Sequence, residues 1–505
     1  MDVTARIAAY VASRLPSDRK KWFNQYKDPK IVHDALWGTF RLQPHEVALI
    51  DTPLVQRLRY IHQTGAASLT YPSAKHSRFE HTLGVLYQAG RICSALTAQP
   101  EEKRFDETFQ NNARCAAILH DTGHGPFSHT SEQYFSSMET MQQIKESDRR
   151  FKESGAGEIL SYLITQSEPF VQFISQLNNH YRIAIDPARI GQIITGSMGD
   201  DRMYESEIIH GPFDADKLDY MHRDGMFSGL KMHVDLDRLY NSILVKAGIS
   251  EGQQMTRLAG SMSGTSPLTQ IMFNKMLLYT GIYHHHKVRA VDCMLWAIFD
   301  LAVNNGYRVG GKQLQTPIDF LELTDDLLLV QELTDSNDIM EIISAIRNRR
   351  LWKRALVIAR RTVPEGMHEK PRDKIKGLFN DFVVLGGNDR RKILRRREIA
   401  DRIWEEAGRP CKQHEVWLDI PKLPSMEEAE RMWIDAPGQE EPVTLGEVLP
   451  IAEWVELYGT HKWRAHVFCP SDVRQKINQA SKVVLEKEFG LKVNDLATQY
   501  ANIQD

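Results

Sequence analysis

The sequence predicts a mostly helical protein with a smaller α+β region in its last third, and three observations support this prediction. Between 44 and 305, apolar residues recur at spacings of three and four, which is the period of an amphipathic helix. Alternating, strand-like runs occur only at 29–42, 415–420 and 464–470. Near residue 345 the pattern changes to mixed helix and strand.

The predicted elements fall into three regions. Region 1–43 holds an N-terminal helix and a short hairpin around a glycine. Region 44–344 is the helical core, and its last long helix is expected to run unbroken through 268–305. Region 345–505 is the α+β part, which ends in one further helix.

Composition excludes several classes of protein. The 505 residues are 42% hydrophobic and 26% charged, which is ordinary for globular domains. No apolar run reaches about 18 residues and the start lacks the features of a secretory signal, so neither a membrane partner nor secretion is expected. Five scattered cysteines without a CxxC pair argue against disulfides and fit a reducing cytoplasm. The net charge of −3 does not by itself call for a nucleic-acid partner.

The stretch "ILHDTGHGPFSH", residues 118–129, places three histidines and an aspartate close together. Neighbours on a helix point about 100° apart, so His120 and Asp121 can reach one ion only at a helix end, which Asp-Thr-Gly supplies. With His81 and Asp216 they form the order H…HD…D, a metal-ligand pattern. Taken alone, each feature has a plainer explanation: a polar turn, a core histidine, and an N-cap aspartate.

The flanking residues favour the metal site. The segments "IDTPLVQRLRYIHQTGAASLTYPSAKHSRFEHTLGV", "HDTGHGPFSH" and "DADKLDYMHRD" resemble the HD-domain deoxynucleoside triphosphate triphosphohydrolases, both the bacterial dGTPase group and the mammalian SAM-and-HD-domain enzyme. The resemblance extends from about Lys30 to about residue 490. It implies an HD-domain metallohydrolase core, and no SAM domain is expected because the N-terminal segment is short.

The resemblance implies hydrolysis of a dNTP to a deoxynucleoside and inorganic triphosphate, with attack at the α-phosphorus. A divalent metal ion would be held by His81, His120, Asp121 and Asp216, and Asp216 also counts among the catalytic residues. Nitrogen and oxygen ligands suit iron, manganese, nickel and magnesium alike, so the metal stays open. Such an ion stabilises charge on the α-phosphate and orients or acidifies the attacking water.

Two histidines are expected to serve the proton chemistry, because the O5′ leaving group needs a proton and imidazole titrates near neutral pH. The resemblance implies that His129 is the general acid and that His124 lies near the α-phosphate and its water. The alternative for either residue is a structural role, with the ring bonded to a carbonyl.

The resemblance also implies a set of substrate contacts. These are Arg78, Lys217 and Tyr220 for the phosphates, and Gln63, Thr64 and Asp224 for the sugar. Tyr283 lies on the helix "YTGIYHHHKVRA", of which one turn is expected to face the base or sugar, and the alternatives on that helix are Tyr279, His284, His286 and Lys287. Thr64 stands where the family often has leucine. Its smaller side chain would exclude the 2′-OH of a ribonucleotide less strictly. A loose alignment puts Lys152 where a catalytic-site histidine often sits, and a solvated surface lysine is the alternative.

A regulatory site is implied as well. In regulated members a guanine nucleotide binds at a subunit interface, and the corresponding residues here are Asp51, Gln56 and Arg59 for the base, and Lys30, His33, Arg349 and Lys353 for further nucleotide contacts. A carboxylate accepts from guanine N1–H and N2–H₂, while arginine donates to O6. The alternative is a helix start followed by an exposed polar face. With the site, the chain is expected to be a homo-oligomer, a tetramer, activated by guanine nucleotide or dNTP.

The sequence also allows other interpretations of the protein's partners and function. The basic block 347–402 is expected to hold activator-phosphate contacts and solvated surface, with single-stranded nucleic acid as a secondary partner. A phosphodiesterase or nuclease of the HD class is disfavoured because no H-D-x-G-Y-P extension is present. A non-catalytic nucleotide sensor is the remaining alternative. The expected cellular role is control or depletion of dNTP pools, and anti-phage defence is one use that no residue specifies.

Overall fold

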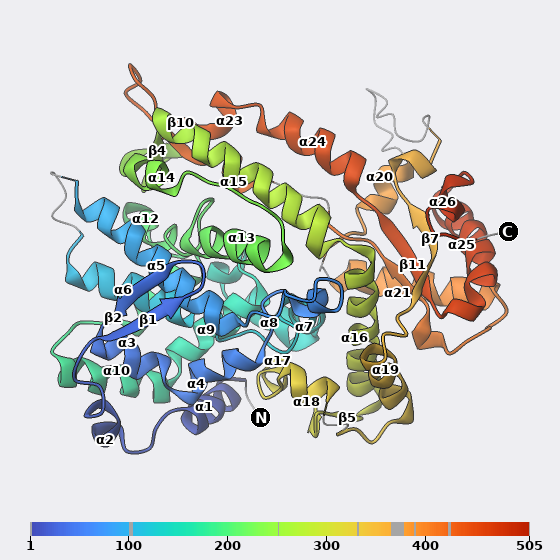
Figure 1. The fold of residues 1–505 in the computed structure, drawn as a ribbon, viewed down its shortest axis with the longest axis horizontal. Coiled ribbons are helices and arrows are strands. Elements are labelled where there is room, and N and C mark those ends of the chain that lie inside the picture. The colour runs from blue at the N-terminus through green and yellow to red at the C-terminus, as the bar shows by residue number, and fades with distance from the viewer. Residues whose placement is uncertain are drawn as a thin grey trace.

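The computed structural model describes residues 3–99, 105–250, 252–330, 333–364, 378–387, 390–422 and 426–503. It confirms a mostly helical fold with a smaller region that contains a sheet (Figure 1). In this view the helical core fills the left side, and the C-terminal sheet with its helices lies at the right.

The N-terminal region contains two helices and the predicted hairpin. Its elements are α1 (Val3–Arg14), α2 (Arg19–Phe23), β1 (Lys30–Asp34) and β2 (Gly38–Leu42). The strands pair antiparallel, with Lys30 opposite Leu42 and Asp34 opposite Gly38. Leu42 and Asp34 are buried while Lys30, Ile31, His33 and Arg41 are exposed, so the hairpin lies on the surface of the core.

The helical core packs around three long helices. Its main elements are α3 (Pro44–Ile50), α4 (Pro53–Gln56), α5 (Arg78–Thr97), α6 (Glu107–Leu119), α7 (His129–Ser136), α9 (Ala156–Gln166), α13 (Ala215–Ser228), α15 (Thr265–Leu278), α16 (His286–Asn305) and α19 (Asn337–Arg347). Helix α5 packs against both α6 and α13, and one continuous buried cluster runs from Ile7 to Trp352. This packing brings the ends of α5, α6 and α13 to one place.

Shorter elements cover this core. They are α8 (Glu139–Ser147), α10 (Glu168–Tyr181), α11 (Pro187–Ile194), α12 (Met203–Ser206), α14 (Leu236–Ser242), β5 (Arg308–Val309), β6 (Lys312–Gln313), α17 (Pro317–Phe320) and α18 (Asp325–Leu329). Among the described residues, every helix is too short or too polar to span a bilayer.

Two features of the core differ from the prediction. Strands β3 (Ile243–Ser250) and β4 (Gln253–Ser261) form a hairpin where helix was expected, with the turn at Gly252, whose φ is +81°. The long helix is also broken: α15 ends at Leu278, a single π turn follows, and α16 begins at His286 after the N-cap His285. In both cases local turn chemistry outweighs the apolar period.

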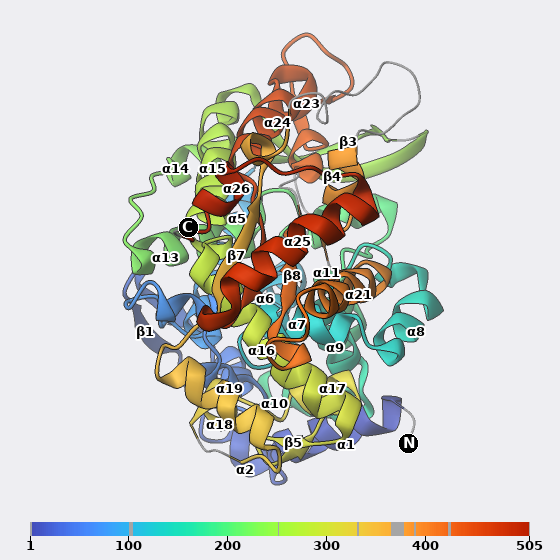
Figure 2. The same cartoon turned by 90° about the vertical axis from the view of Figure 1, so that its right-hand side faces the viewer.

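The C-terminal region is built on a three-stranded sheet of order β7-β11-β8, from Lys353–Ile358, Ala465–Cys469 and Trp417–Asp419. The predicted strands near 415–420 and 464–470 are therefore confirmed. Helix α25 (Arg474–Phe489) crosses the face of this sheet and packs beside α21 (Arg390–Glu406) (Figure 2). A second buried cluster, from Ala355 to Ala497, lies between the sheet and these helices.

One C-terminal segment joins the first core instead. Its elements are α22 (Glu427–Glu430), β9 (Trp433–Asp435), β10 (Val443–Thr444), α23 (Leu445–Val448) and α24 (Ile451–Lys462); α20 (Leu378–Val383) and α26 (Leu496–Gln499) complete the chain. Strand β9 pairs parallel with β4, and Met426 and Ile434 belong to the first cluster. The region boundaries at 43 and 344 stay a prediction.

Candidate active site

Three helices carry the metal cluster, which we define as His81, His120, Asp121 and Asp216. His81 lies in the first turns of α5, whose start is fixed by a capping box. His120 is the C-cap of α6 and Asp121 follows it, so the end of the helix lets both side chains face one point. Asp216 lies in the first turn of α13.

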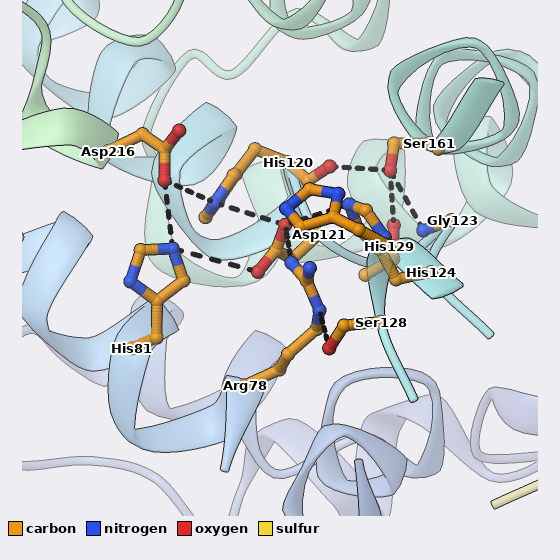
Figure 3. A network of polar contacts seen from close by, with 12 residues as sticks. Arg78, His81, His120, Asp121, Gly123, His124, Ser128, His129, Ser161 and Asp216 are labelled. Atoms are coloured by element: carbon orange, nitrogen blue, oxygen red, sulfur yellow. Dashed lines mark hydrogen bonds and ion pairs between the residues drawn. The ribbon is translucent and has the colours of Figure 1, made fainter. Parts of the chain in front are cut away.

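The ligand atoms of the metal cluster converge (Figure 3). His81 Nε2 is 2.9 Å from Asp216 Oδ1 and 3.7 Å from Asp121 Oδ2. His120 Nε2 is 3.4 Å from Asp121 Oδ1 and 3.8 Å from Asp216 Oδ1. Ligand atoms that each lie about 2.1 Å from one ion are about 3 to 3.5 Å apart, so this spacing suits a shared divalent ion.

The same atoms need a partner. His81 Nε2, His120 Nε2 and Asp121 Oδ2 are buried and have no hydrogen-bond partner among the described residues. Buried polar atoms without a partner are costly, and coordination to a cation would satisfy all three. The residues present therefore fit a divalent metal, whose identity the donor set leaves open.

The charge distribution of the metal cluster also favours a cation. Burial alone would lower the pKa of His81, but Asp216 and Asp219 raise it to about 10. Burial alone would raise the pKa of Asp121, but Arg78 and the neighbouring histidines hold it well below its usual range. Positive charge is thus stabilised where these groups meet.

Contacts behind the two histidines select their tautomers. His81 Nδ1 is 2.8 Å from Asp219 Oδ2, and His120 Nδ1 is 2.7 Å from the carbonyl oxygen of Ala117. Both acceptors favour a proton on Nδ1, which leaves Nε2 free to bind a metal.

The loop after the His-Asp pair is strained at two residues. Phe127 and Ser128 both have a φ of 55°, in the left-handed region that L-residues rarely adopt. Asp325 Oδ1 accepts a hydrogen bond from the Phe127 N–H at 2.7 Å, which helps to hold this conformation. The loop then starts α7 at His129, whose ring lies perpendicular to that of His124, 5.1 Å away.

Arg78 is buried beside the metal cluster. Its Nη1 is 2.6 Å from Asp121 Oδ1, and its Nε donates to Ser128 Oγ at 2.9 Å. Its Nη2 is buried and has no hydrogen-bond partner in the part of the chain that the structure describes. A guanidinium held in this way has one nitrogen left to donate to an anionic oxygen, which suits the expected phosphate contact.

His124, His129 and Glu132 form a second group next to the metal cluster, here named the proton-transfer group. Glu132 Oε2 is 2.7 Å from His129 Nδ1 and 3.8 Å from His124 Nδ1. Burial, and then the cation of Arg78, lower the pKa of His124 to about 3, so its ring is neutral near pH 7. The His129 side chain is 66% exposed and backed by a carboxylate, which suits a general acid.

Gln63, Asp224 and Tyr283 lie close to one another and are named the sugar group. The Gln63 N–H donates to the His76 carbonyl at 3.0 Å, and His76 Nε2 is 2.7 Å from Asp224 Oδ1. The Tyr283 hydroxyl donates to the other oxygen of Asp224. Gln63 Oε1 is buried without a hydrogen-bond partner among the described residues, and Thr64 is buried beside it.

Two lysines lie at the rim of the metal cluster. Lys217 Nζ donates to Asp214 Oδ2 and to a backbone carbonyl, both at 2.8 Å. Burial lowers the pKa of Lys275 to about 8, and the nearby Lys217 adds to this effect. Glu428 Oε2, from α22, is 3.7 Å from Lys217 Nζ. Tyr220 lies one turn after Lys217, and burial raises the pKa of its phenol well above the usual value.

The expectation for Lys152 needs correction. Its side chain is 84% exposed, and its Nζ lies 3.9 Å from Glu153 Oε1, on a turn before α9. The ammonium points to solvent, so the structure favours the alternative of a surface lysine. The loose alignment could not detect that this turn ends outside the metal cluster.

Four of the expected activator residues form a partly exposed group, which we name the activator surface: Lys30 of β1, Asp51 at the end of α3, Gln56 of α4, and Arg59 in the turn that follows α4. Lys30 Nζ is 3.2 Å from Asp51 Oδ2, and Gln56 Nε2 is 3.5 Å from Asp51 Oδ1. Arg59 Nε donates to Gln56 Oε1 at 2.7 Å, with its guanidinium over the Phe79 ring at 3.6 Å.

The remaining expected activator residues lie on other elements. His33 Nδ1 is 2.8 Å from the Thr39 hydroxyl within the N-terminal hairpin. The Arg349 guanidinium donates to the Leu69 carbonyl, and Lys353 is exposed at the start of β7.

The basic block 347–402 is described only in part. Residues 365–377, 388 and 389 lie outside the described residues. In the described part, Arg395 and Arg402 both pair with Glu488, so some of its charge is neutralised within the protein.

Sequence reasoning missed three residues of the site: Glu132, Asp219 and Lys275. Glu132 follows His129 by three residues and Asp219 follows Asp216 by three, so helical spacing was an available signal for both. Lys275 lies on α15, far along the chain from the motif, and no local pattern distinguishes it from a surface lysine.

The fold and the paired His-Asp ligands define an HD domain. Residues 78–224 match the HD domain family model, and residues 261–492 match the HD associated region. The structure of a hypothetical protein from Aquifex aeolicus has the same fold, with a TM-score of 0.57 and 23% identity over 90% of this chain and 99% of that one.

Sequence relatives narrow the family. An uncharacterized protein of Methanocaldococcus jannaschii is 26% identical over 94% of this chain and 88% of its own length. The deoxynucleoside triphosphate triphosphohydrolase SAMHD1 homolog of Dictyostelium discoideum is 27% identical over 66% of this chain, and human SAMHD1 is 28% identical over 64%. This chain spans 61% and 54% of those two proteins. It is an HD-domain protein related in sequence to the deoxynucleoside triphosphate triphosphohydrolases.

Proposed function

We propose that this protein is a divalent-metal-dependent dNTP triphosphohydrolase that converts a dNTP and water into a deoxynucleoside and inorganic triphosphate. The observation that carries the proposal is that both other groups connect to the metal cluster: His124 Nε2 is 3.4 Å from Asp121 Oδ1, and Asp224 of the sugar group lies on the same helix, α13, as Asp216. Together they offer a metal site, a proton donor and polar contacts for a deoxyribose. The names of the SAMHD1 relatives support the same activity.

The phosphate contacts come from buried cations. His81, His120, Asp121 and Asp216 would hold the metal, which when bound stabilises charge on the α-phosphate and makes water a better nucleophile. Arg78 Nη2 donates to the same phosphate. A triphosphate carries about four negative charges, and the two rim lysines bind its outer part.

The proton chemistry falls to the two histidines. Water attacks the α-phosphorus, the bond from phosphorus to O5′ breaks, and His129 gives its proton to O5′ of the departing deoxynucleoside; a proton released from the attacking water then restores the one that His129 has given up. Glu132 bonds His129 Nδ1, so it orients the ring and stabilises its charged form. His124, neutral at pH 7, has the character of an acceptor that positions the water.

Substrate selection and regulation follow from the other two groups. The carboxylate of Asp224 and the amide of Gln63 bind the 3′-OH, while Tyr283 keeps Asp224 in place. A guanine nucleotide at the activator surface would replace the Lys30–Asp51 ion pair, which is half exposed. Activation in a homo-oligomer would supply the further cations that its triphosphate needs.

A turnover screen tests the proposal. Purified protein with Mn²⁺ or Mg²⁺ is given each dNTP alone and then all four, with and without GTP, and the products are separated by chromatography. We expect deoxynucleoside and intact triphosphate. Monophosphate with pyrophosphate would place the cleavage at another bond and contradict the proposal. Bound dNTP without any product would favour a nucleotide sensor.

A further inference from the structure

A buried network behind His81 reaches the N-terminal hairpin. His81 Nδ1 is 2.8 Å from Asp219 Oδ2, and Asp219 is completely buried. Arg223 donates to both oxygens of Asp219, at 2.9 Å from Nε and at 3.0 Å from Nη2. The remaining contact comes from the indole N–H of Trp37, which donates to Asp219 Oδ1. Trp37 lies 182 residues before Asp219 in the chain, in the turn between β1 and β2.

Asp34 fixes the turn that carries Trp37. Its Oδ1 accepts from the backbone N–H groups of Leu36 and Trp37, at 2.8 and 2.9 Å. Its Oδ2 is 3.0 Å from Arg223 Nη1. One carboxylate therefore holds both the backbone of Trp37 and the arginine that pairs with Asp219, so the turn and the network form one unit.

The indole ring of Trp37 packs between two other aromatic rings. It stacks on Tyr87 with ring centroids 5.6 Å apart and an interplanar angle of 15°, and His222 meets it edge-on at 5.5 Å. Asp219, which the indole contacts, is also approached closely by α5: a Cβ on Gly84 would lie 1.8 Å from Asp219 Oδ1. Only glycine lets α5 approach Asp219 this closely, which indicates that the position of this carboxylate is built into the fold.

We propose that Trp37 is a positioning residue for the metal ligand His81. Its indole N–H orients Asp219, and Asp219 in turn sets the tautomer and ring direction of His81. Without the indole, Asp219 Oδ1 accepts a hydrogen bond from Arg223 alone. The carboxylate can then rotate together with the Arg223 side chain. This proposal rests on the proposed function in one respect only, namely that His81 is a metal ligand. It does not depend on which substrate is cleaved.

Metal affinity tests the proposal without any substrate. The dissociation constant for Mn²⁺ is measured by electron paramagnetic resonance of the free ion, with full-length protein and no nucleotide. Trp37→Phe keeps an aromatic ring on Tyr87 but removes the N–H donor, and we expect it to weaken Mn²⁺ binding about 10- to 100-fold. Trp37→His restores a ring N–H and is expected to recover part of the affinity.

Trp22→Phe is the matched control. Its indole N–H donates to the Ala48 carbonyl at 2.9 Å, in the same N-terminal region but with no link to Asp219, so Mn²⁺ affinity is expected to stay unchanged. Circular dichroism and thermal unfolding of the metal-free variants check that each one folds. If Trp37→Phe does not fold, the comparison of Trp37→His with Trp37→Leu decides in the same way.

Three outcomes would overturn the proposal: unchanged Mn²⁺ affinity in Trp37→Phe, an equal loss in Trp22→Phe, or no binding of Mn²⁺ by the wild-type protein. A wild-type protein that binds Mn²⁺ with the predicted variant pattern but leaves dNTPs intact would refute the proposed function alone.

Discussion

The metal cluster and the activator surface differ in burial and in how firmly their side chains are held by the rest of the chain. In the metal cluster, His81 has no exposed surface and its Nδ1 is bonded to a buried carboxylate. In the activator surface, the Lys30 side chain is 54% exposed and its ion pair with Asp51 spans 3.2 Å. Exposed ion pairs of this kind contribute about 0 to 1 kcal/mol, so the second surface is held only loosely.

This difference separates a group that one chain assembles from a group that is open to solvent. The metal cluster is assembled by three packed helices of one chain. The activator surface presents a carboxylate, an amide and a guanidinium that are partly exposed, which suits a ligand that a second surface covers. The N-terminal hairpin joins the two, because it carries both Lys30 and Trp37.

The largest effect is expected from the metal cluster. His120→Ala and Asp121→Asn should each lower dNTP hydrolysis by about 10³-fold or more, because they remove a ligand and the charge stabilisation that the ion provides. Both should also lose the increase in melting temperature that Mn²⁺ gives the wild-type protein. Lys152→Ala, on the exposed turn, is the control and should keep full activity. A metal-free variant that remains active would refute the metal assignment.

A somewhat smaller effect is expected in the proton-transfer group. His129→Ala should lower kcat by about 10²- to 10⁴-fold, the usual range for a lost general acid. Its affinity for Mn²⁺ should equal that of the wild-type protein, since His129 is outside the metal cluster. An altered Mn²⁺ affinity, measured by calorimetry, would show instead that the second group also holds a metal.

The activator surface should show an effect only when nucleotide is present. Asp51→Ala should abolish stimulation by GTP, and couplings of this kind are typically about 5- to 150-fold. The rate without GTP should change little, because Asp51 lies apart from the metal cluster. Initial rates with and without GTP give the ratio directly, and an unchanged ratio would remove Asp51 from the activator surface.

A modest effect is expected where the C-terminal region meets the rim lysines. Glu428 lies 3.7 Å from Lys217, where a triphosphate would have to displace it. Glu428→Gln should therefore lower the KM for dNTP by about 2- to 5-fold, the value of one exposed ion pair. Glu427→Gln, on the same helix, is the control. A higher KM in Glu428→Gln would mean that the carboxylate assists binding.

The smallest effect concerns stability and pH. The hydrogen bond to Asp325 raises the pKa of His62 above 6.5 in the folded state, despite the opposing effect of burial. The charged pair therefore stabilises the protein fully below pH 6.5, and this contribution is lost as the pH rises through the raised pKa. Urea unfolding on both sides of pH 6.5 should show that decline in the wild-type protein, and Asp325→Asn should reduce it.

Local pattern was enough to predict the elements of the metal cluster. The order of His81, His120, Asp121 and Asp216, with the helix end after Asp121 and the family resemblance of the flanking segments, needs no knowledge of distant contacts. The same holds for the hairpin at 29–42 and the strand that became β11, because alternation over five residues is a local property. The β3–β4 hairpin was missed because the turn at Gly252 outweighs the apolar period there, and its pairing with β9, nearly 180 residues later, leaves no local signal.

Tertiary packing determines which charged side chains lie beside the metal cluster. By sequence alone Lys152 and Lys275 are equivalent lysines, yet one points to solvent and the other is half buried beside Lys217. Trp37 and Asp219 likewise carry no mutual signal in the chain. The sequence by itself predicted the HD-domain resemblance, the expected metal ligands and the helical class, because these depend on motifs, local order and residue type. The layer of residues around the ligands was decided only by the packing of α5, α13 and the N-terminal hairpin, since contacts across 182 residues depend on the whole fold.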